Sequence, residues 1–298
     1  MFHPKTILNT IIFLLTTALL FSGHLAASDK DFSEHYSQIY QIRVVSPAAG
    51  SKSSIGSGFQ ISADGLIMTN YHVISDYVNS PDAFEIQYYD HNGDTGTLEL
   101  IDFDVINDLA VLKHPDPADS YLMFSSESSV KGESLYALGN PHDWGVVMVP
   151  GPNNGLVEHS FKEQILFSGS LNGGMSGGPT LNDIGEVVGV NVATAGSQLS
   201  FLVPAKHAID LVGSKKQISP GNYEAEIAKQ ISQWQQTRIG QLLGLPWETK
   251  EFDGKELIAE LRKDFRCWGE TNEDDKQRKY NESTRYCYTS DDLYISAT

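Results

Sequence analysis

The chain has 298 residues, of which 40% are hydrophobic and 20% are charged. This is an ordinary globular composition, and the length suffices for one large or two modest domains with a buried core. The formal net charge of −17 repels phosphate backbones and anionic lipid headgroups. We therefore expect no binding to nucleic acid or to membrane surfaces.

Residues 1–27 have the pattern of a secretory signal peptide. Lys5 precedes an apolar run from Ile11 to Phe21, and the small-residue stretch Ala26-Ala27-Ser28 follows. The run is shorter than the roughly 20 apolar residues that a membrane-spanning helix needs. We predict cleavage near Ala27, a periplasmic or secreted protein and no stable membrane insertion after cleavage. An uncleaved anchor is the alternative.

Between about residues 40 and 206, short alternating stretches are separated by Gly, Pro, Asn and Asp turns. Such spacing, with no long helix between the stretches, is typical of an all-β sandwich or a pair of barrels. The strand candidates span residues 57–62, 66–68, 83–89, 97–102, 109–113, 134–138, 145–149, 164–168, 186–193 and 200–203.

Residues 216–298 form a C-terminal extension of different pattern. Two amphipathic helices are predicted from apolar residues at helical spacing, which are Ile227, Ile231 and Trp234 in the first and Leu257, Leu261 and Phe265 in the second. The stretch from Cys267 to Tyr294 is polar and predicts a loop or hairpin. We expect the extension to pack onto the β region, and its role stays open.

The only two cysteines are Cys267 and Cys287. Export would place them in an oxidising compartment, where a disulfide persists. A metal or redox pair is disfavoured because there is no Cys-x-x-Cys spacing and no histidine close to either residue in the sequence. We therefore predict a disulfide between Cys267 and Cys287.

Ser176 lies in the glycine-rich stretch Gly173-Gly174-Met175-Ser176-Gly177-Gly178-Pro179. A serine hydroxyl is a weak nucleophile unless a base removes its proton and backbone N–H groups receive the oxyanion. Glycines allow the sharp turn and the close approach of a substrate carbonyl that such a site needs. The predicted oxyanion donors are the N–H groups of Gly174 and Ser176. A flexible Gly-Ser-Gly loop is the competing interpretation.

The five residues 174–178 also match the Gly-x-Ser-x-Gly elbow of α/β-hydrolases. An elbow joins a strand to a helix, and its acid and histidine follow the serine in sequence. Here a turn and a strand follow Ser176, and the only downstream histidine is His207. Upstream, His72 and Asp108 give the order His, Asp, Ser, which is the order of the trypsin-type triad. Asp102 and Asp104 are rival candidates for the acid.

Six stretches that follow one another in order resemble the trypsin-like peptidases of the bacterial Deg/HtrA type. They are Gly56-Ser57-Gly58-Phe59, Thr69-Asn70-Tyr71-His72-Val73, Asn107-Asp108-Leu109-Ala110-Val111-Leu112, Gly139-Asn140-Pro141, Gly174-Met175-Ser176-Gly177-Gly178-Pro179 and Phe201-Leu202-Val203-Pro204. The resemblance covers about residues 54–206.

The resemblance implies a mainly β fold of two antiparallel six-stranded barrels, the first over about residues 35–120 and the second over about 121–215. With the extension, this gives a protease domain at 28–215 followed by a helical segment with a disulfide-tied end. The resemblance also implies that His72 takes the proton of Ser176 and later protonates the leaving amine, while Asp108 orients the imidazole. No metal or cofactor is implied.

The chain departs from the family pattern at two points. Met175 stands where relatives often carry Asn or Asp, and only its backbone shapes the oxyanion hole. The extension lacks a recognisable PDZ domain, so regulation and cage assembly are not carried over from the family, and the oligomeric state stays open.

The resemblance places the primary substrate pocket at Ser170, Leu171, Asn191 and Val192. Ser170 offers no carboxylate for Lys or Arg, and Leu171 and Asn191 replace the Thr and His of glutamate-specific relatives. We therefore expect small or medium apolar residues before the cleaved bond.

The sequence as a whole predicts an exported serine endopeptidase acting on proteins or peptides. A catalytically silent protein that uses the protease fold for binding, or a serine esterase, is the alternative.

Overall fold

The computed structural model describes residues 32–48, 50–141, 144–158, 160–194, 199–244, 248–252, 254–259, 265–272, 277–280, 282–289 and 293–295. The chain divides into two compact units, residues 1–33 and 34–298, and the second is described below. The predicted signal peptide lies outside the described residues. Within them, no helix combines the length and the hydropathy that a bilayer-spanning segment requires.

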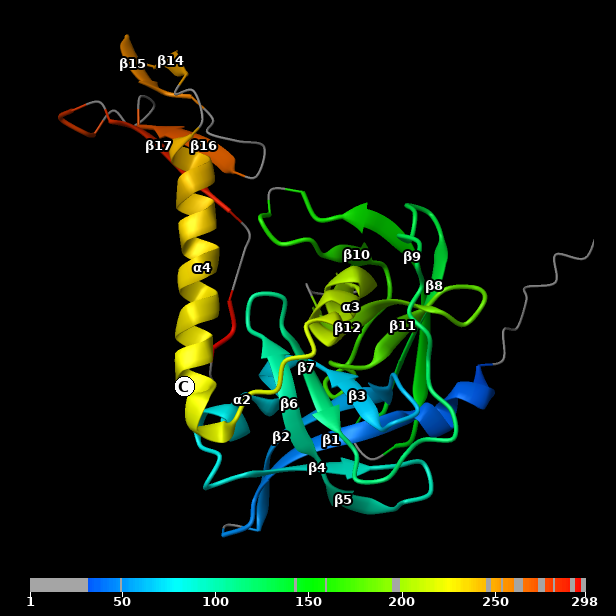
Figure 1. Ribbon diagram of the computed structural model, residues 1–298. Helices are drawn as coiled ribbons and strands as arrows, with labels where there is room; N and C mark the ends of the chain where they lie inside the picture. The colour runs from blue at the N-terminus through cyan, green and yellow to red at the C-terminus, as the bar shows by residue number, and fades with distance from the viewer. Residues whose placement is uncertain are drawn as a thin grey trace, which may run out of the picture. The chain divides into compact units, whose positions relative to one another are not determined.

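Antiparallel strands dominate the first half of the chain and form one seven-stranded sheet, in the order β5-β4-β1-β2-β3-β7-β6 (Figure 1). Its strands are β1 (Ile39–Ser46), β2 (Ser51–Gln60), β3 (Leu66–Thr69), β4 (Glu85–Tyr89), β5 (Thr95–Thr97), β6 (Glu99–Asp104) and β7 (Leu109–Lys113). In β7 the four residues Leu109 to Leu112 are all buried, because this strand lies between β3 and β6.

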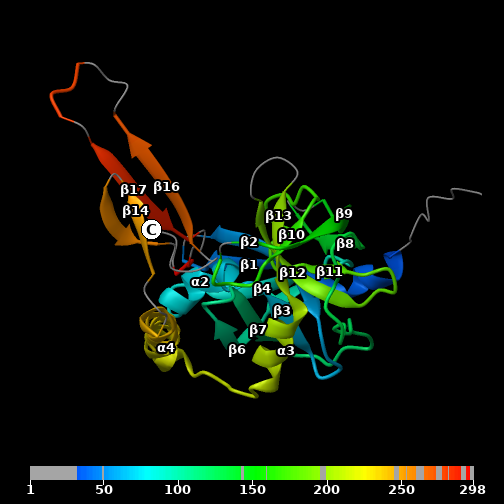
Figure 2. The ribbon, with the colours of Figure 1, turned by 90° about the horizontal axis from the view of Figure 1, so that it is seen from above.

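The next six strands close into a barrel in the order β10-β13-β12-β11-β8-β9. They are β8 (Ser134–Gly139), β9 (Val147–Leu156), β10 (Ile165–Phe167), β11 (Pro179–Leu181), β12 (Val187–Thr194) and β13 (Ser200–Pro204). Figure 2 shows this green barrel beside the blue and cyan sheet. The prediction of two six-stranded barrels is therefore correct for the second barrel only. The first is a half-barrel, because β5 and β6 lie at its two ends and do not pair with each other.

Helices are few among the described residues. They are the 3-10 helices η1 (Ser33–Gln38) and η2 (Pro220–Asn222) and the α-helices α2 (Tyr71–Asn79), α3 (Ala205–Gly213) and α4 (Tyr223–Leu243). His72 is the second residue of α2. Asn70 makes this possible, because it separates β3 from α2 and adopts an extended N-cap conformation.

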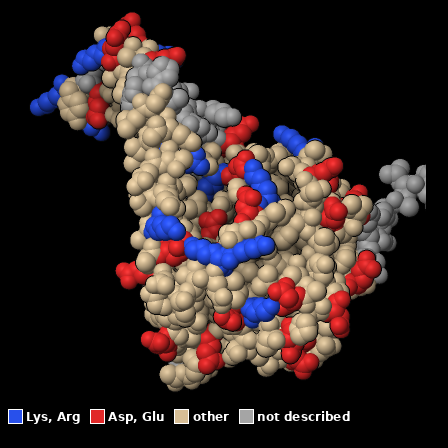
Figure 3. Space-filling model, viewed as in Figure 1, with Lys and Arg blue, Asp and Glu red and all other residues tan. Residues whose placement is uncertain are grey.

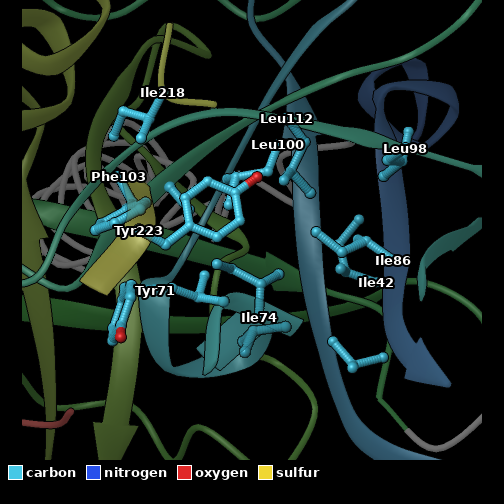
Figure 4. Packing of buried hydrophobic residues seen from close by; sticks show 14 of the residues in the cluster. Ile42, Tyr71, Ile74, Ile86, Leu98, Leu100, Phe103, Leu112, Ile218 and Tyr223 are labelled. Carbon is cyan, nitrogen blue, oxygen red and sulfur yellow. The ribbon is translucent and has the colours of Figure 1, made fainter. Parts of the chain in front are cut away.

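The extension begins as a part of the core of the first sheet. Tyr223 is 2% exposed and packs edge to face on Phe103, with ring centroids 5.9 Å apart. Figure 4 shows both rings in one cluster with Tyr71 and Ile218. The first half of α4 therefore contributes apolar side chains to the sheet, as the helical spacing of Ile227 and Ile231 predicted.

The second predicted helix of the extension is wrong. Leu257 lies in β15 (Lys255–Ile258), which pairs with β14 (Thr249–Phe252). Asp253-Gly254 between these strands is the dipeptide most typical of a two-residue hairpin turn, and Gly254 has a φ of 69°. Phe265 is not in a helix either, and Leu261 lies outside the described residues. The prediction is therefore contradicted at Leu257 and Phe265.

The end of the extension is a hairpin of β16 (Arg266–Thr271) and β17 (Ser283–Tyr288). Cys267 and Cys287 face each other in its register and form a disulfide. The predicted disulfide and hairpin are thus confirmed.

On the face shown in Figure 3, acidic side chains are interspersed with basic ones over the half-barrel, the barrel and the extension.

Candidate active site

Asp108 binds His72 at two points. Its Oδ2 lies 2.7 Å from the ring Nδ1 of His72, and its Oδ1 accepts the backbone N–H of His72 at 2.8 Å. Asp108 directly precedes β7 and has a φ of 57°, a left-handed conformation that Asp and Asn tolerate better than other side chains. The Asn70 side chain donates to the Asp108 carbonyl at 2.8 Å. The structure thus brings two predicted site residues together through the start of α2.

The pKa of His72 is set by opposing effects. Burial lowers it, whereas the charge of Asp108 and its hydrogen bond raise it, and the net result is a pKa above the ordinary value of 6.5. The His72 side chain is 25% exposed and that of Asp108 is 14% exposed. The imidazole is therefore buried enough to interact strongly with the carboxylate, and it is still accessible to a ligand.

The rival acids are placed elsewhere. Asp102 is 4% exposed and accepts from the Ser214 hydroxyl at 2.9 Å. Asp104 accepts from the backbone N–H groups of Ile106 and Asn107, so it shapes the turn before Asp108. Of the three candidates, Asp108 is the one in contact with His72.

Ser176 lies in a glycine-rich turn between β10 and β11. Gly174 has a φ of 91° and the Asn172 carbonyl accepts from the Met175 N–H at 3.0 Å, the signature of a type II turn with glycine at its third position. Gly177 has a φ of 85°, and a Cβ there would meet the Ser57 carbonyl oxygen at 2.2 Å. These glycines are therefore required by the backbone path around Ser176.

The Ser176 hydroxyl donates to the Val192 carbonyl at 2.5 Å. Val192 is in β12, and its side chain lines a cavity of about 380 Å³ together with His72 and Asp108. The structure thus places Ser176 beside the wall of the cavity that contains the other two predicted residues.

Ser57 joins the sheet to the turn around Ser176. Its hydroxyl donates to the Gly174 carbonyl at 2.6 Å and accepts from the Asn140 N–H at 2.8 Å. Its own N–H donates to the Ser176 carbonyl at 2.7 Å. The sequence interpretation used Ser57 only as part of a motif. The small side chain of Ser57 stands between Gly56 and Gly58. This pattern was the available sign that another backbone approaches closely here.

Three of the four predicted pocket residues lie away from the cavity beside His72. The Asn191 side chain is fully buried, donates to the Leu138 and Met175 carbonyls and accepts from Thr180. Leu171 is 3% exposed in the apolar core of the barrel. Val192 alone lines the cavity, and the assignment of a primary pocket to these residues stays a prediction.

The cavity also contains a residue that the sequence interpretation did not consider. Tyr294, from the C-terminal extension, lines it together with the apolar residues Phe201 and Val203. The ring of Tyr294 meets that of His72 edge to face, with centroids 5.7 Å apart and an interplanar angle of 68°. No local sequence signal links Tyr294 to His72, because 221 intervening residues separate them.

Known proteins resemble the chain in sequence. A family model for the trypsin-like peptidase domain matches residues 56–190. A protein of Chlamydia trachomatis described as a probable periplasmic serine endoprotease of DegP-like type is 33% identical over 181 residues. The alignment covers 56% of this chain and 35% of that protein, so the chain spans about a third of the length of this relative.

Solved structures agree in fold. The crystal structure of the serine endoprotease from Yersinia pestis matches with a TM-score of 0.53 and 26% identity, over 61% of this chain and 64% of that one. The active form of the Rv3671c protease from M. tuberculosis matches with a TM-score of 0.56 over 63% of this chain and 85% of that one. At 21% identity the second match shows the fold alone. Residues 56–190 thus match the trypsin-like peptidase domain in sequence, and the solved proteases match the chain in fold.

Proposed function

We propose that the chain is an exported serine endopeptidase with Ser176 as nucleophile, His72 as general base and Asp108 as the residue that orients the base. The observation that carries the proposal is the two-point contact of Asp108 with His72, at 2.7 Å to Nδ1 and 2.8 Å to the backbone N–H. A carboxylate in this position fixes the tautomer that leaves Nε2 free to accept a proton, and it stabilises the imidazolium that then forms.

In the proposed reaction, His72 takes the proton of Ser176 while the Ser176 oxygen attacks the substrate carbonyl. The negative charge on the carbonyl oxygen is received by the N–H groups of Gly174 and Ser176. The C–N bond then breaks, and the His72 proton goes to the leaving amine. Water, activated by His72, hydrolyses the acyl-enzyme and regenerates Ser176. The Ser57 contact with Gly174 supports this arrangement because it holds the backbone of the turn.

Proteins or peptides are the proposed substrates, cleaved after a small or medium apolar residue, and the periplasm or the exterior of the cell is the proposed location. The signal-like pattern of residues 1–27 and the periplasmic relative from Chlamydia support export. Profiling on a peptide library tests the preference, and Arg, Lys or Glu before the cleaved bond would contradict it.

A fluorophosphonate probe, which labels activated serines, tests the proposed nucleophile. We expect labelling of the full chain and none of Ser176→Ala. A casein assay then separates a peptidase from a serine esterase, because an esterase would label and hydrolyse esters without degrading casein. Absence of labelling of the folded protein under all conditions would contradict the catalytic proposal.

A catalytically silent binding protein is the second candidate, and one observation favours it. The Ser176 hydroxyl donates to the Val192 carbonyl at 2.5 Å and must leave this partner before His72 can take its proton. Rotation about χ1 connects staggered side-chain conformations, so we expect the serine to reach His72 when substrate binds. The labelling experiment decides between the two.

A further inference from the structure

Residues 293–295 of the extension are held against the helix that carries His72. The Tyr71 hydroxyl donates to the Ile295 carbonyl at 3.0 Å, and the Asn79 side chain donates to the same oxygen at 3.4 Å. Tyr71 is fully buried and begins α2, while Asn79 ends it. The Ile295 carbonyl is thus anchored to both ends of α2, and His72 lies on the same helix.

This anchor fixes Tyr294 beside the predicted base. The ring of Tyr294 approaches the His72 ring edge to face, a geometry that aromatic pairs favour. Because the neighbouring Ile295 is held by α2, Tyr294 and His72 are positioned by the same element. Their contact is therefore part of the cavity wall.

Tyr294 lines the cavity without filling it. About 380 Å³ remain open with Tyr294 in place, which lies within the range of about 300–1,000 Å³ found for ligand pockets. A side chain that plugged the cavity would leave little space and would itself be buried, whereas Tyr294 is 39% exposed. The open volume is therefore available to a substrate side chain.

Of the remaining wall residues, five are apolar and four, Asn107, Lys162, Glu163 and Gln164, are polar or charged. Val105, Val157, Phe201 and Val203 face the open volume together with Tyr294. The carboxylate of Glu163 at the rim is paired with Lys206 and lies 3.3 Å from His207 Nε2. This carboxylate is compensated by its neighbours, and the apolar wall residues offer contacts to an apolar side chain.

We propose that Tyr294 is a specificity-determining residue, which completes from the C-terminal extension an apolar subsite for a bulky side chain near the cleaved bond, at a position other than the residue that directly precedes it. The position follows from the walls: His72 lines the cavity, and so does Val192, whose carbonyl binds the Ser176 hydroxyl. A side chain in this space belongs to a residue within a few positions of the attacked carbonyl. The inference rests on the proposed peptidase function.

The test measures kcat/KM on paired peptides that share one small apolar residue before the cleaved bond and differ at a single neighbouring position, with Leu or Phe in one peptide and Gly in the other. Tyr294→Ala in the full chain removes the wall, and we expect the preference for the bulky peptide to fall about ten-fold, as for the loss of methylene-sized contacts in an apolar pocket. Tyr294→Phe keeps the ring and should retain the preference. Tyr280→Ala is the matched control, because Tyr280 belongs to the same extension and is 58% exposed.

The ratio between the two peptides separates this inference from the proposed function. If the full chain labels with fluorophosphonate and cleaves peptides, but Tyr294→Ala keeps the wild-type ratio, the subsite inference is wrong and the peptidase stands. An equal rise in kcat/KM for both peptides would also overturn it, because Tyr294 would then act as an obstacle. A full chain that neither labels nor cleaves would contradict the peptidase itself.

Discussion

The two carboxylate oxygens of Asp108 have different partners, and this divides its role into two parts. One oxygen binds the ring of His72 and the other binds its backbone N–H. The first sets the protonation behaviour of the imidazole, and the second fixes the start of α2 relative to β7. Because Asn shares the tolerance of Asp for left-handed backbone, Asp108→Asn removes the charge while preserving the φ of 57°.

We expect Asp108→Asn to lower kcat by about 10⁴-fold, as a wrongly held imidazole tautomer does in a triad. The residual pH profile carries a second signature. The general base must be neutral, so the acidic limb of kcat/KM in the wild type lies above pH 6.5, where the raised pKa of His72 falls. Without the charge of Asp108, burial still lowers that pKa, and the limb shifts to lower pH.

Steady-state rates from pH 5 to 9 measure both effects. The control is Asp116→Asn, which neutralises an exposed carboxylate on the loop after β7 and should leave the profile unchanged. An unshifted acidic limb in Asp108→Asn would exclude Asp108 as the main cause of the raised pKa.

Ser57→Ala tests the link between the sheet and the turn of Ser176. The substitution leaves the Gly174 carbonyl and the Asn140 N–H without their hydroxyl partner, and we expect the free energy of unfolding to fall by about 1–3 kcal/mol. Because Gly174 carries a proposed oxyanion donor, kcat should fall as well, with a smaller change in KM. Urea unfolding and steady-state kinetics measure the two effects. Ser51→Ala, at an exposed position of the same strand, should change neither.

The candidate site residues that the sequence suggested are those that stand in a local motif typical of a catalytic role. His72, Asp108 and Ser176 stand in short stretches of recognisable order, and the structure brings His72 and Asp108 into contact. Ser57 and Tyr294 were missed because their contacts join segments that are distant along the chain. Asn191 was read as a pocket residue, but its position relative to the core depends on the closure of the barrel, which periodicity does not encode.

At the scale of elements, strands could be predicted where turn residues flank them or where buried residues recur at a regular spacing. Eight strands agreed with the sequence to within two residues at each end, which are β3, β4, β6, β7, β8, β10, β12 and β13. In contrast, β2 begins six residues before its predicted start and β9 ends seven residues after its predicted end. The strands β1, β5, β11, β14 and β15 were not predicted. Short strands such as β5 and β11 contain three residues each, too few to establish a period of two. The error at Leu257 arose because three apolar residues at helical spacing were used for the prediction, whereas the Asp253-Gly254 dipeptide, a strong hairpin signal, was not considered.

The disulfide is expected to stabilise its own hairpin and little else. A two-stranded hairpin alone is marginally stable, and a cross-link with a sequence separation of 20 contributes about 3 kcal/mol by the chain-entropy estimate. Replacing both Cys267 and Cys287 by Ser should therefore speed amide exchange in β16 and β17 by about 100-fold. Amides of the barrel from β8 to β13 should exchange as in the wild type.

Hydrogen exchange followed by mass spectrometry resolves these segments, and the wild type with its disulfide reduced is the matched control. Faster exchange throughout the barrel would show that the hairpin also stabilises the barrel. Unchanged exchange in β16 and β17 would show that strand pairing alone maintains the hairpin.

At the scale of the whole molecule, the start of the extension packs into the hydrophobic core of the half-barrel. Ile218, Tyr223 and Ile227 belong to the same buried cluster as the sheet residues. Gln230 of α4 accepts from the Val105 N–H at 2.9 Å and donates to the Phe103 carbonyl at 2.8 Å. The helix thus holds the end of β6 and the residues that lead to Asp108. Because the half-barrel is open, α4 covers apolar side chains of its sheet that a closed barrel would bury by itself.

Two truncations separate the roles of the extension. A chain ending after Lys215 loses three buried side chains, each worth about 1.5–3 kcal/mol, which together approach the total stability of a typical domain of about 5–15 kcal/mol. We expect it to unfold or aggregate. A chain ending after Gly244 keeps α4 and should stay folded and active, but it loses Tyr294 and with it the preference for a bulky side chain near the cleaved bond.

Urea unfolding and the paired peptides measure stability and preference for both truncations. Ile239→Ala in the full chain is the control, because Ile239 lies on α4 and is 55% exposed, and its loss should cost less than about 0.5 kcal/mol. If the chain ending after Lys215 proved as stable as the full chain, the packing of α4 would be dispensable and the half-barrel would fold without cover. If the chain ending after Gly244 lost its activity entirely, the extension would act on the reaction itself, because neither the core of the sheet nor the contacts of Asp108 would have changed.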